Sequence, residues 1–118
     1  MQPTGGELLV AALQRWGIDT LFTLTGGHLF PVYDACVKQG LRLVDTRHEQ
    51  TAVFAAEGLA KLRRGVALAA VTAGPGVTNS LSAVASARAN GTPLLLLARA
   101  FSRYSASVSL SWNWSAVG

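Results

Sequence analysis

The sequence has little charge and almost no cysteine, and both shortages restrict what the protein can be. Charged residues make up only 14% of the 118 residues, whereas hydrophobic residues make up 50%. Because so little of the chain suits a fully solvated surface, this balance favours a sheet covered by helices on both faces, or a domain that buries more surface against a partner. Cys36 stands alone, so the sequence excludes a disulfide framework and a cysteine-based metal site, and the cytoplasm is the expected compartment.

Segments that direct a chain to a membrane are also missing. The first residues contain no basic stretch followed by an apolar run, so no signal peptide is expected. The longest apolar stretches, such as 93–98, are far too short to span a bilayer. The net charge of +4 comes from dispersed basic residues, apart from the short run Lys61, Arg63 and Arg64. A nucleic-acid surface needs a denser basic stripe, so neither nucleic acid nor a membrane is an expected partner.

Several catalytic and nucleotide-binding motifs do not occur. No serine lies in the Gly-x-Ser-x-Gly elbow of an α/β-hydrolase. The glycines match neither the phosphate loop that ends in Gly-Lys-Ser/Thr nor the three-glycine dinucleotide fingerprint. His48 has no second histidine or cysteine at a useful ligand spacing, so no metal site is expected.

What the sequence does contain is an alternation of helical and strand-like patterns. Helices are expected at 6–15, 29–39, 49–64 and 77–90, and strands at 18–24, 41–44, 66–71 and 94–97. The first helix carries on one face Leu8, Leu9, Ala12 and Leu13. Alternating elements with short connections require parallel strands and right-handed crossovers. The predicted fold is therefore an α/β domain, an open doubly wound parallel sheet flanked by helices on both faces.

The polar residues of the chain gather in three loops that follow predicted strands, at 25–28, 45–49 and 72–79. In open α/β sheets ligands bind outside the carboxyl ends of the strands, so these loops should form one site. The glycines of 74–76 would let backbone approach a ligand, although an ordinary tight turn explains them equally well. His28 has the chemistry of an acid or base near neutral pH, and a surface or capping role is the simpler alternative.

Glu49 opens the third expected helix. Asp45 or Thr46 is expected to cap that helix, because a short oxygen-bearing side chain can accept a hydrogen bond from a free amide one turn on. The helix dipole favours a negative charge in the first turn, which is the simplest explanation of Glu49. The polar and glycine-rich loops around it favour a functional role instead.

Three segments together carry a resemblance to a known family. They are Gly26-Gly27-His28, then Asp45-Thr46-Arg47-His48-Glu49-Gln50-Thr51-Ala52, then Thr72-Ala73-Gly74-Pro75-Gly76-Val77-Thr78-Asn79. In this order and spacing they resemble the N-terminal pyrimidine-binding domain of thiamine-diphosphate enzymes. The resemblance is greatest to acetolactate synthase-like proteins, followed by 2-hydroxyacyl-CoA lyases and oxalyl-CoA decarboxylases.

The resemblance implies a role for each matching residue. Glu49 would be catalytic, because in that family the matching glutamate hydrogen-bonds the pyrimidine ring of thiamine diphosphate and favours the imino tautomer that deprotonates the thiazolium ring. The pyrimidine half of the cofactor would be bound by Gly26, Gly27, His28, Glu49, Gly74, Pro75, Gly76 and Asn79. The complete enzyme would decarboxylate and ligate 2-keto acids, or cleave a 2-hydroxyacyl-CoA.

The sequence also departs from that family. No Gly-Asp-Gly occurs, so the domain that holds the diphosphate is missing and magnesium is expected on it. Residues 1–99 are interpreted as a truncated pyrimidine-binding domain, and residues 100–118 as a divergent, poorly ordered tail. Such a chain should be inert alone and should join a homo- or hetero-oligomer with a diphosphate-binding domain. The alternatives are a non-catalytic assembly module that docks on such a partner, and an unrelated α/β domain that binds anions at the helix start 76–79.

Overall fold

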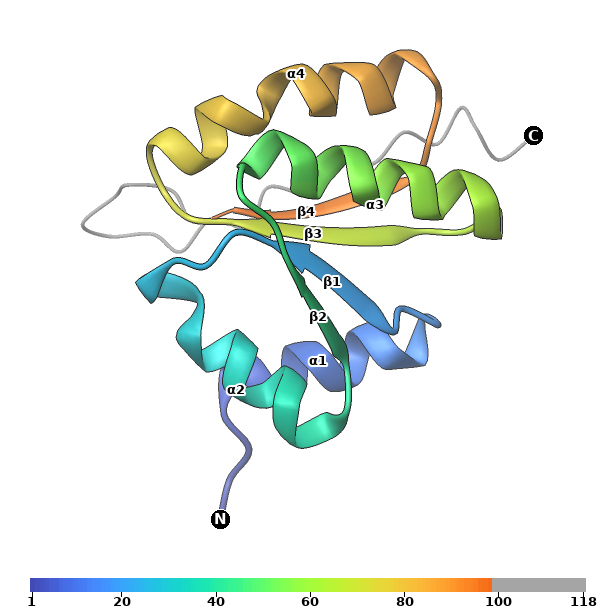
Figure 1. Ribbon diagram of the computed structural model, residues 1–118. Coiled ribbons are helices and arrows are strands. Elements are labelled where there is room, and N and C mark those ends of the chain that lie inside the picture. Colours follow the sequence, from blue (N-terminus) through green and yellow to red (C-terminus); the bar gives the residue numbers. More distant parts are fainter. Residues whose placement is uncertain (99–118) are drawn as a thin grey trace.

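A computed structural model describes residues 1–98 and shows a four-stranded sheet between two layers of helices (Figure 1). The helices are α1 (Gly5–Arg15), η1 (Gly27–Leu29, a 3-10 helix), α2 (Phe30–Gln39), α3 (Glu49–Arg63) and α4 (Pro75–Ala89). The strands are β1 (Thr20–Thr23), β2 (Arg42–Asp45), β3 (Ala67–Val71) and β4 (Leu94–Ala98). The strand order is β2-β1-β3-β4 and every neighbouring pair is parallel, so the predicted fold class is confirmed. The interpretation of residues 100–118 as a tail lies outside the described residues.

Each face of the sheet has its own hydrophobic core. Figure 1 shows α1 and α2 on one face, and α3 and α4 on the other. Under α1 and α2 the core is built largely from bulky aliphatic side chains, among them Val10, Leu13, Leu21, Leu68 and Leu95. Under α3 and α4 it is built mainly from alanine, with Ala56, Ala60, Ala69, Ala83 and Ala87. Because alanine side chains are short, α3 and α4 can pack closely on the sheet and on one another.

The buried face of α1 differs from the predicted one. Two of the four expected core residues, Leu8 and Ala12, are exposed, whereas Val10 is fully buried. The reason is the contact of α1 with α2: a Cβ atom at Gly6 would lie only 2.4 Å from the backbone oxygen of Pro31. Since Gly6 and Val10 lie one turn apart on the helix, this close approach directs Val10 into the core.

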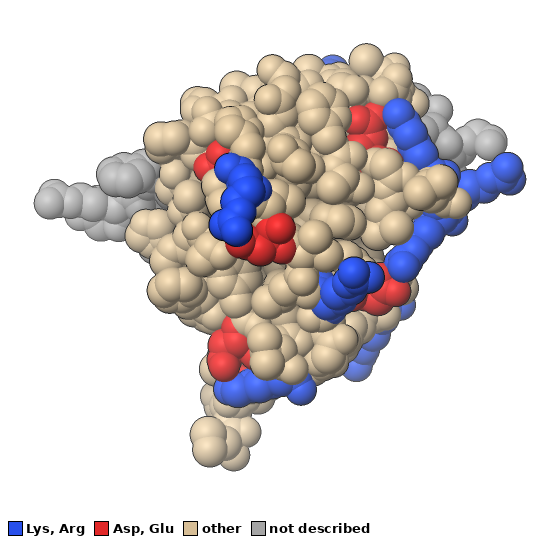
Figure 2. Space-filling view, viewed as in Figure 1, with Lys and Arg blue, Asp and Glu red and all other residues tan. Residues whose placement is uncertain are grey.

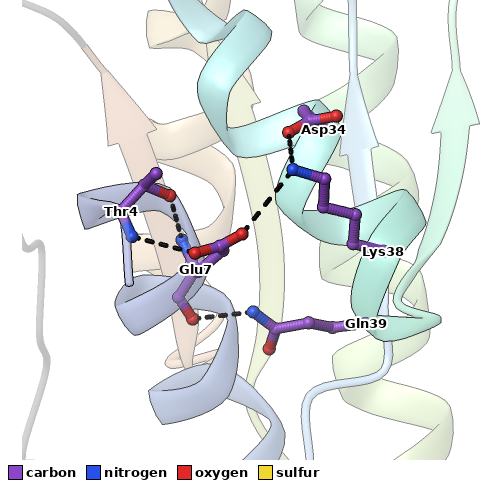
Figure 3. A network of polar contacts seen from close by, with 5 residues as sticks. All are labelled: Thr4, Glu7, Asp34, Lys38 and Gln39. Atoms are coloured by element: carbon purple, nitrogen blue, oxygen red, sulfur yellow. Dashed lines mark hydrogen bonds and ion pairs between the residues drawn. The ribbon is translucent and has the colours of Figure 1, made fainter. Parts of the chain in front are cut away.

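Polar side chains also join α1 to α2, as Figure 3 shows. Thr4 caps α1, because its Oγ1 accepts a hydrogen bond from the Glu7 amide at 3.2 Å while its own amide donates to Glu7 Oε2 at 2.9 Å. From α2, Gln39 Nε2 donates to the Glu7 backbone oxygen at 2.9 Å. Lys38 Nζ lies 2.8 Å from Asp34 Oδ2 and 3.7 Å from Glu7 Oε1. The helix start and the neighbouring helix therefore share one network.

Charged side chains are spread over several parts of the surface in Figure 2, and basic ones often lie beside acidic ones. The structure contains the ion pairs Lys38–Asp34, Lys61–Glu57 and Arg63–Asp19. Within residues 1–98, no helix combines the length and the apolar character needed to cross a membrane. The cysteine, Cys36, is a buried free thiol, and burial raises its pKa.

Candidate functional site

Three loops leave the carboxyl ends of β1, β2 and β3 at the same edge of the sheet. From β1 the chain passes to β2 on one side, and β3 then pairs with β1 on its other side. The direction of winding therefore reverses between β1 and β3. In doubly wound sheets this reversal leaves room for a ligand at the carboxyl edge. The loops that carry the predicted site residues open at this point.

The loop after β1 is hydrogen-bonded to the loop after β2. The backbone amide and Oγ1 of Thr25 donate to Asp45 Oδ1 at 3.3 and 3.1 Å. The amide of Thr46 donates to the backbone oxygen of Thr23 at 2.8 Å, which continues the β1–β2 pairing by one residue. Thr46 is buried, so these bonds keep the second loop against the first.

The loop after β1 also touches the loop after β3. A Cβ atom at Gly26 would lie 2.7 Å from Cβ of Thr72, and Cβ atoms in proteins essentially never lie so close to another heavy atom. The φ of Gly26 is −147°, an ordinary extended value. Glycine is therefore required here by the close approach of the two loops, and not by an unusual backbone conformation.

Glu49 connects the second loop to the third. It is the first residue of α3 and only 8% of its surface is exposed. Its Oε2 accepts a hydrogen bond from Asn79 Nδ2 of α4 at 3.1 Å. A Cβ atom at Gly76 would lie 3.7 Å from its Oε1 and 3.1 Å from Cγ2 of Thr72. The carboxyl group thus lies beside Gly76 in the first turn of α4, next to the side chain of Thr72.

The second oxygen of Glu49 is available for a ligand. Among the described residues, Oε1 accepts no hydrogen bond, whereas Oε2 is held by Asn79. In residues 1–98, every fully buried side-chain nitrogen or oxygen atom has a hydrogen-bond partner. Since Oε1 has no such partner, it is not fully buried and retains contact with solvent. A carboxylate with one fixed and one accessible oxygen can accept or share a proton at a defined place.

These segments match a known family over almost the whole chain. Residues 3–114 match the family described as "Thiamine pyrophosphate enzyme, N-terminal TPP binding domain". The chain belongs to this family. The alternative of an unrelated anion-binding domain is therefore wrong.

Relatives of this TPP-binding domain agree with the resemblance inferred from the motifs. The chain is 58% identical to the acetolactate synthase large subunit IlvG of Mycobacterium tuberculosis over 92 residues, which is 78% of this chain and 17% of that protein. It is 53% identical to human 2-hydroxyacyl-CoA lyase 2 over 98 residues, which is 83% of this chain and 16% of that protein. The chain therefore spans about a sixth of the length of the curated relatives that it matches.

The start of α3 in this TPP-binding domain differs from the prediction. Neither Asp45 nor Thr46 caps the helix; His48 does, because its Nδ1 accepts a hydrogen bond from the amide of Gln50 at 3.1 Å. Asp45 instead accepts from the loop after β1, and the hydroxyl of Thr46 donates to the backbone oxygen of His48 at 2.9 Å. Asp45 thus binds the loop after β1, and the Thr46 hydroxyl binds backbone oxygens of Thr23 and His48. The imidazole of His48 caps the helix in their place.

The start of α4 lies two residues earlier than predicted, at Pro75. Gly74 precedes it with φ +71° and ψ −121°, a conformation that L side chains rarely adopt. The amide of Val77 donates to the Gly74 oxygen at 3.0 Å and begins the helix. No heavy atom outside its immediate neighbours lies within 4 Å of a Cβ atom built at Gly74, so this backbone is open.

The remaining predicted residues lie at the rim of the site. Gly27 and His28 are exposed in η1. The nearest atom to a Cβ atom built at Gly27 is a ring carbon of Phe30 at 3.8 Å, so Gly27 contributes accessible backbone. Of the eight predicted residues, the structure brings Glu49, Gly76 and Asn79 into one cluster and places Gly26 against the loop that leads to it. The catalytic and cofactor-binding roles of all eight residues stay predictions.

The prediction missed the buried residues that hold the loops in place. Oγ1 of Thr23 donates to the backbone oxygen of Ala70 at 2.9 Å, which joins β1 to β3 directly beneath the site. The same Oγ1 lies 2.8 Å from the hydroxyl of Tyr33, and burial raises the pKa of that phenol. A threonine at the end of an apolar strand, just before a glycine loop, is the signal that could have indicated this role.

Two further features of the described residues concern metal ligands and pockets. No three His, Cys, Asp or Glu side chains among them lie close enough to hold a metal ion. A pocket of about 180 Å³ lies at the opposite edge of the sheet, where Trp16, Asp19 and Arg63 surround the first residues of β1 and β3. That pocket is remote from the three loops and is not part of the site.

Proposed function

We propose that residues 1–99 form the pyrimidine-binding part of an acetolactate synthase-like thiamine-diphosphate enzyme and that Glu49 is its catalytic residue. One observation carries this proposal. Glu49 is buried where three loops meet, with Oε2 fixed by Asn79 and Oε1 accessible beside Gly76. A helix cap or a surface carboxylate needs no such arrangement, because water solvates it equally well.

In this proposal Glu49 acts by sharing a proton with the pyrimidine ring. Its accessible Oε1 would share a proton with a ring nitrogen, and Asn79 keeps the carboxyl group from rotating away. Hydrogen bonds that involve an ionised group are about twice as strong as neutral ones, and burial strengthens them further. When bound, thiamine diphosphate supplies a carbon centre that stabilises a carbanion, and the protein tunes it.

The glycines shape the surface beside Glu49. Gly74 is exposed and leaves its backbone open, Gly26 and Gly76 allow close packing against Thr72, and Pro75 fixes the first turn of α4. Backbone amides at the start of a helix can donate to a polar ligand. We assign Gly27 and His28 to the rim of the same surface, where His28 is exposed to an incoming cofactor.

The diphosphate and magnesium are assigned to another domain. The sequence contains no Gly-Asp-Gly, the start of the motif that holds them in the resembling family. Residues 1–99 would act together with such a domain, in a homo- or hetero-oligomer. The substrate is a 2-keto acid or an acyl-CoA, and the buried free thiol of Cys36 suits the reducing cytoplasm.

Titration of the chain with the free aminopyrimidine half of the cofactor, followed by amide NMR, tests this proposal. We expect weak binding that shifts the resonances of Gly26, Glu49, Gly76 and Asn79. Glu49→Gln should weaken it at least tenfold, because a hydrogen bond to a charged group contributes about 1.5–3 kcal/mol. Glu7→Gln is the matched control, since it removes a first-turn carboxylate from another helix. Shifts elsewhere, or equal affinity in both variants, would favour a non-catalytic assembly module.

A further inference from the structure

A second buried carboxylate lies on α3, two turns after Glu49. Glu57 is only 4% exposed. Its Oε1 accepts hydrogen bonds from Asn90 Nδ2 at 2.7 Å and from Thr92 Oγ1 at 3.4 Å, and Oε2 accepts one from Ser86 Oγ at 3.3 Å. These three donors belong to the last turn of α4 and the connection to β4. Lys61 Nζ, on α3 itself, lies 2.8 Å from Oε1.

The two carboxylates join the same pair of helices at two separate places. Glu49, at the start of α3, binds Asn79 near the start of α4, and Glu57, in the middle of α3, binds Ser86 and Asn90 at the end of α4. Figure 1 shows α3 and α4 side by side on one face of the sheet. Both polar contacts are therefore made across one helix–helix interface.

The apolar interface between these contacts does not by itself fix the position of α4 along the axis of α3. The buried core residues of the two helices between the polar contacts are small: Val53, Ala56, Ala83 and Ala87. Helix packing is specified by side chains that insert into grooves of the partner, and short alanine side chains insert very little. Hydrogen bonds, which are directional, then supply the specificity that the apolar surface lacks.

We propose that Glu57 is a positioning residue that sets the register of α4 against α3 and thereby holds Asn79 on Oε2 of Glu49. Its importance for catalysis rests on the proposed function, because only there does the orientation of Glu49 matter. Glu57 makes contacts to α4 and one contact within α3, and comparing the two kinds tests the positioning role. Asn90 ties Glu57 to α4, whereas Lys61 contacts Glu57 from the same helix, four residues on.

The test uses the full chain without any ligand and follows the Asn79 side-chain amide and the Glu49 carboxyl carbon by NMR at neutral pH. Glu49→Gln and Asn79→Ala identify the resonances of the broken contact. Asn90→Ala and Glu57→Gln should both shift the remaining signals towards those positions. Lys61→Met should leave them unchanged, because it removes a contact within α3 only. Since no cofactor is present, failure of the proposed function would not affect this result.

The proposal is wrong if Asn90→Ala folds and leaves both resonances at their wild-type positions, or if Lys61→Met shifts them as much. A further measurement separates positioning from general destabilisation. In an Asn79→Ala background, Glu57→Gln should no longer move the Glu49 carboxyl resonance, whereas a merely structural effect would persist. Should Glu57→Gln fail to fold, Asn90→Ala decides the outcome alone, since Asn90 is exposed and its loss spares the ion pair with Lys61.

Discussion

Gly26→Ala places one methyl group between two of the loops that form the site. The new Cβ atom would lie 2.7 Å from Cβ of Thr72, whereas carbon atoms in contact prefer about 3.5–4.0 Å. Cβ of Thr72 is bonded directly to the backbone that follows β3, so it cannot rotate away. The loops must therefore separate by roughly 1 Å, which in a packed region typically costs about 1–3 kcal/mol.

Part of this cost is offset, because alanine restricts the unfolded chain more than glycine does, by about 0.4–1 kcal/mol. The net loss of unfolding free energy should be about 1–2 kcal/mol, which corresponds to a fall of roughly 5–10 °C in Tm for a domain of this size. Urea unfolding followed by circular dichroism measures it. Gly27→Ala is the matched control, since its Cβ atom meets nothing closer than 3.8 Å.

A double-mutant cycle identifies the cause of the loss. Thr72→Gly removes the opposing Cβ atom, so adding it to Gly26→Ala should recover about 1 kcal/mol relative to the sum of the single changes. Thr72→Ala keeps that atom and should recover little. If Gly26→Ala is as stable as Gly27→Ala, the loops do not touch as described and the reasoning fails.

Three other predictions concern the helices and the binding of the whole cofactor. The pKa of Glu57 lies below its ordinary value, chiefly because Lys61 donates a hydrogen bond to it. The ionised carboxylate therefore stabilises the folded state above about pH 4.3, and this contribution is lost as the pH falls through the folded-state pKa. Glu57→Gln should therefore cost about 1–3 kcal/mol at pH 7 and less below pH 4 in urea unfolding; a cost independent of pH would contradict this. Gly6→Ala should lower Tm, because the new Cβ atom would clash with the backbone of Pro31. Gly5→Ala is the control and should leave Tm unchanged, since its Cβ atom would meet open space. Equal melting curves would refute the α1–α2 contact. Calorimetry of the chain with thiamine diphosphate and magnesium should show weak binding or none, and a magnesium-dependent micromolar affinity would refute a half-site.

The sheet and the location of the site could be predicted because their signals are local. Each strand is a short apolar run followed by glycine or polar residues, and parallel strands necessarily place these loops at one edge. The strand 66–71 and the loop 72–79 are the clearest cases, and the structure has β3 at Ala67–Val71 with that loop directly after it.

The rest depends on contacts between residues far apart in the sequence. The buried face of α1 follows from the approach of Gly6 to Pro31, and no helical periodicity contains that information. His48 caps α3 only because Asp45 is already engaged by the loop after β1. Glu57 looks like a solvent-facing residue of an alanine-rich helix until α4 is packed against it.

The central claim is that Glu49 exchanges a proton with the cofactor, and hydrogen–deuterium exchange at the thiazolium carbon measures its consequence directly. The assay requires residues 1–97 joined to the remaining part of a relative such as the Mycobacterium tuberculosis acetolactate synthase large subunit. Glu49→Gln should slow this exchange by about two to four powers of ten, the range for losing a positioned acid–base group. Cofactor affinity should change much less if the diphosphate contacts lie on another domain, as proposed. A Glu49→Gln chimera that exchanges its proton at the wild-type rate would contradict the account and leave Glu49 as a first-turn carboxylate that stabilises α3 through the helix dipole.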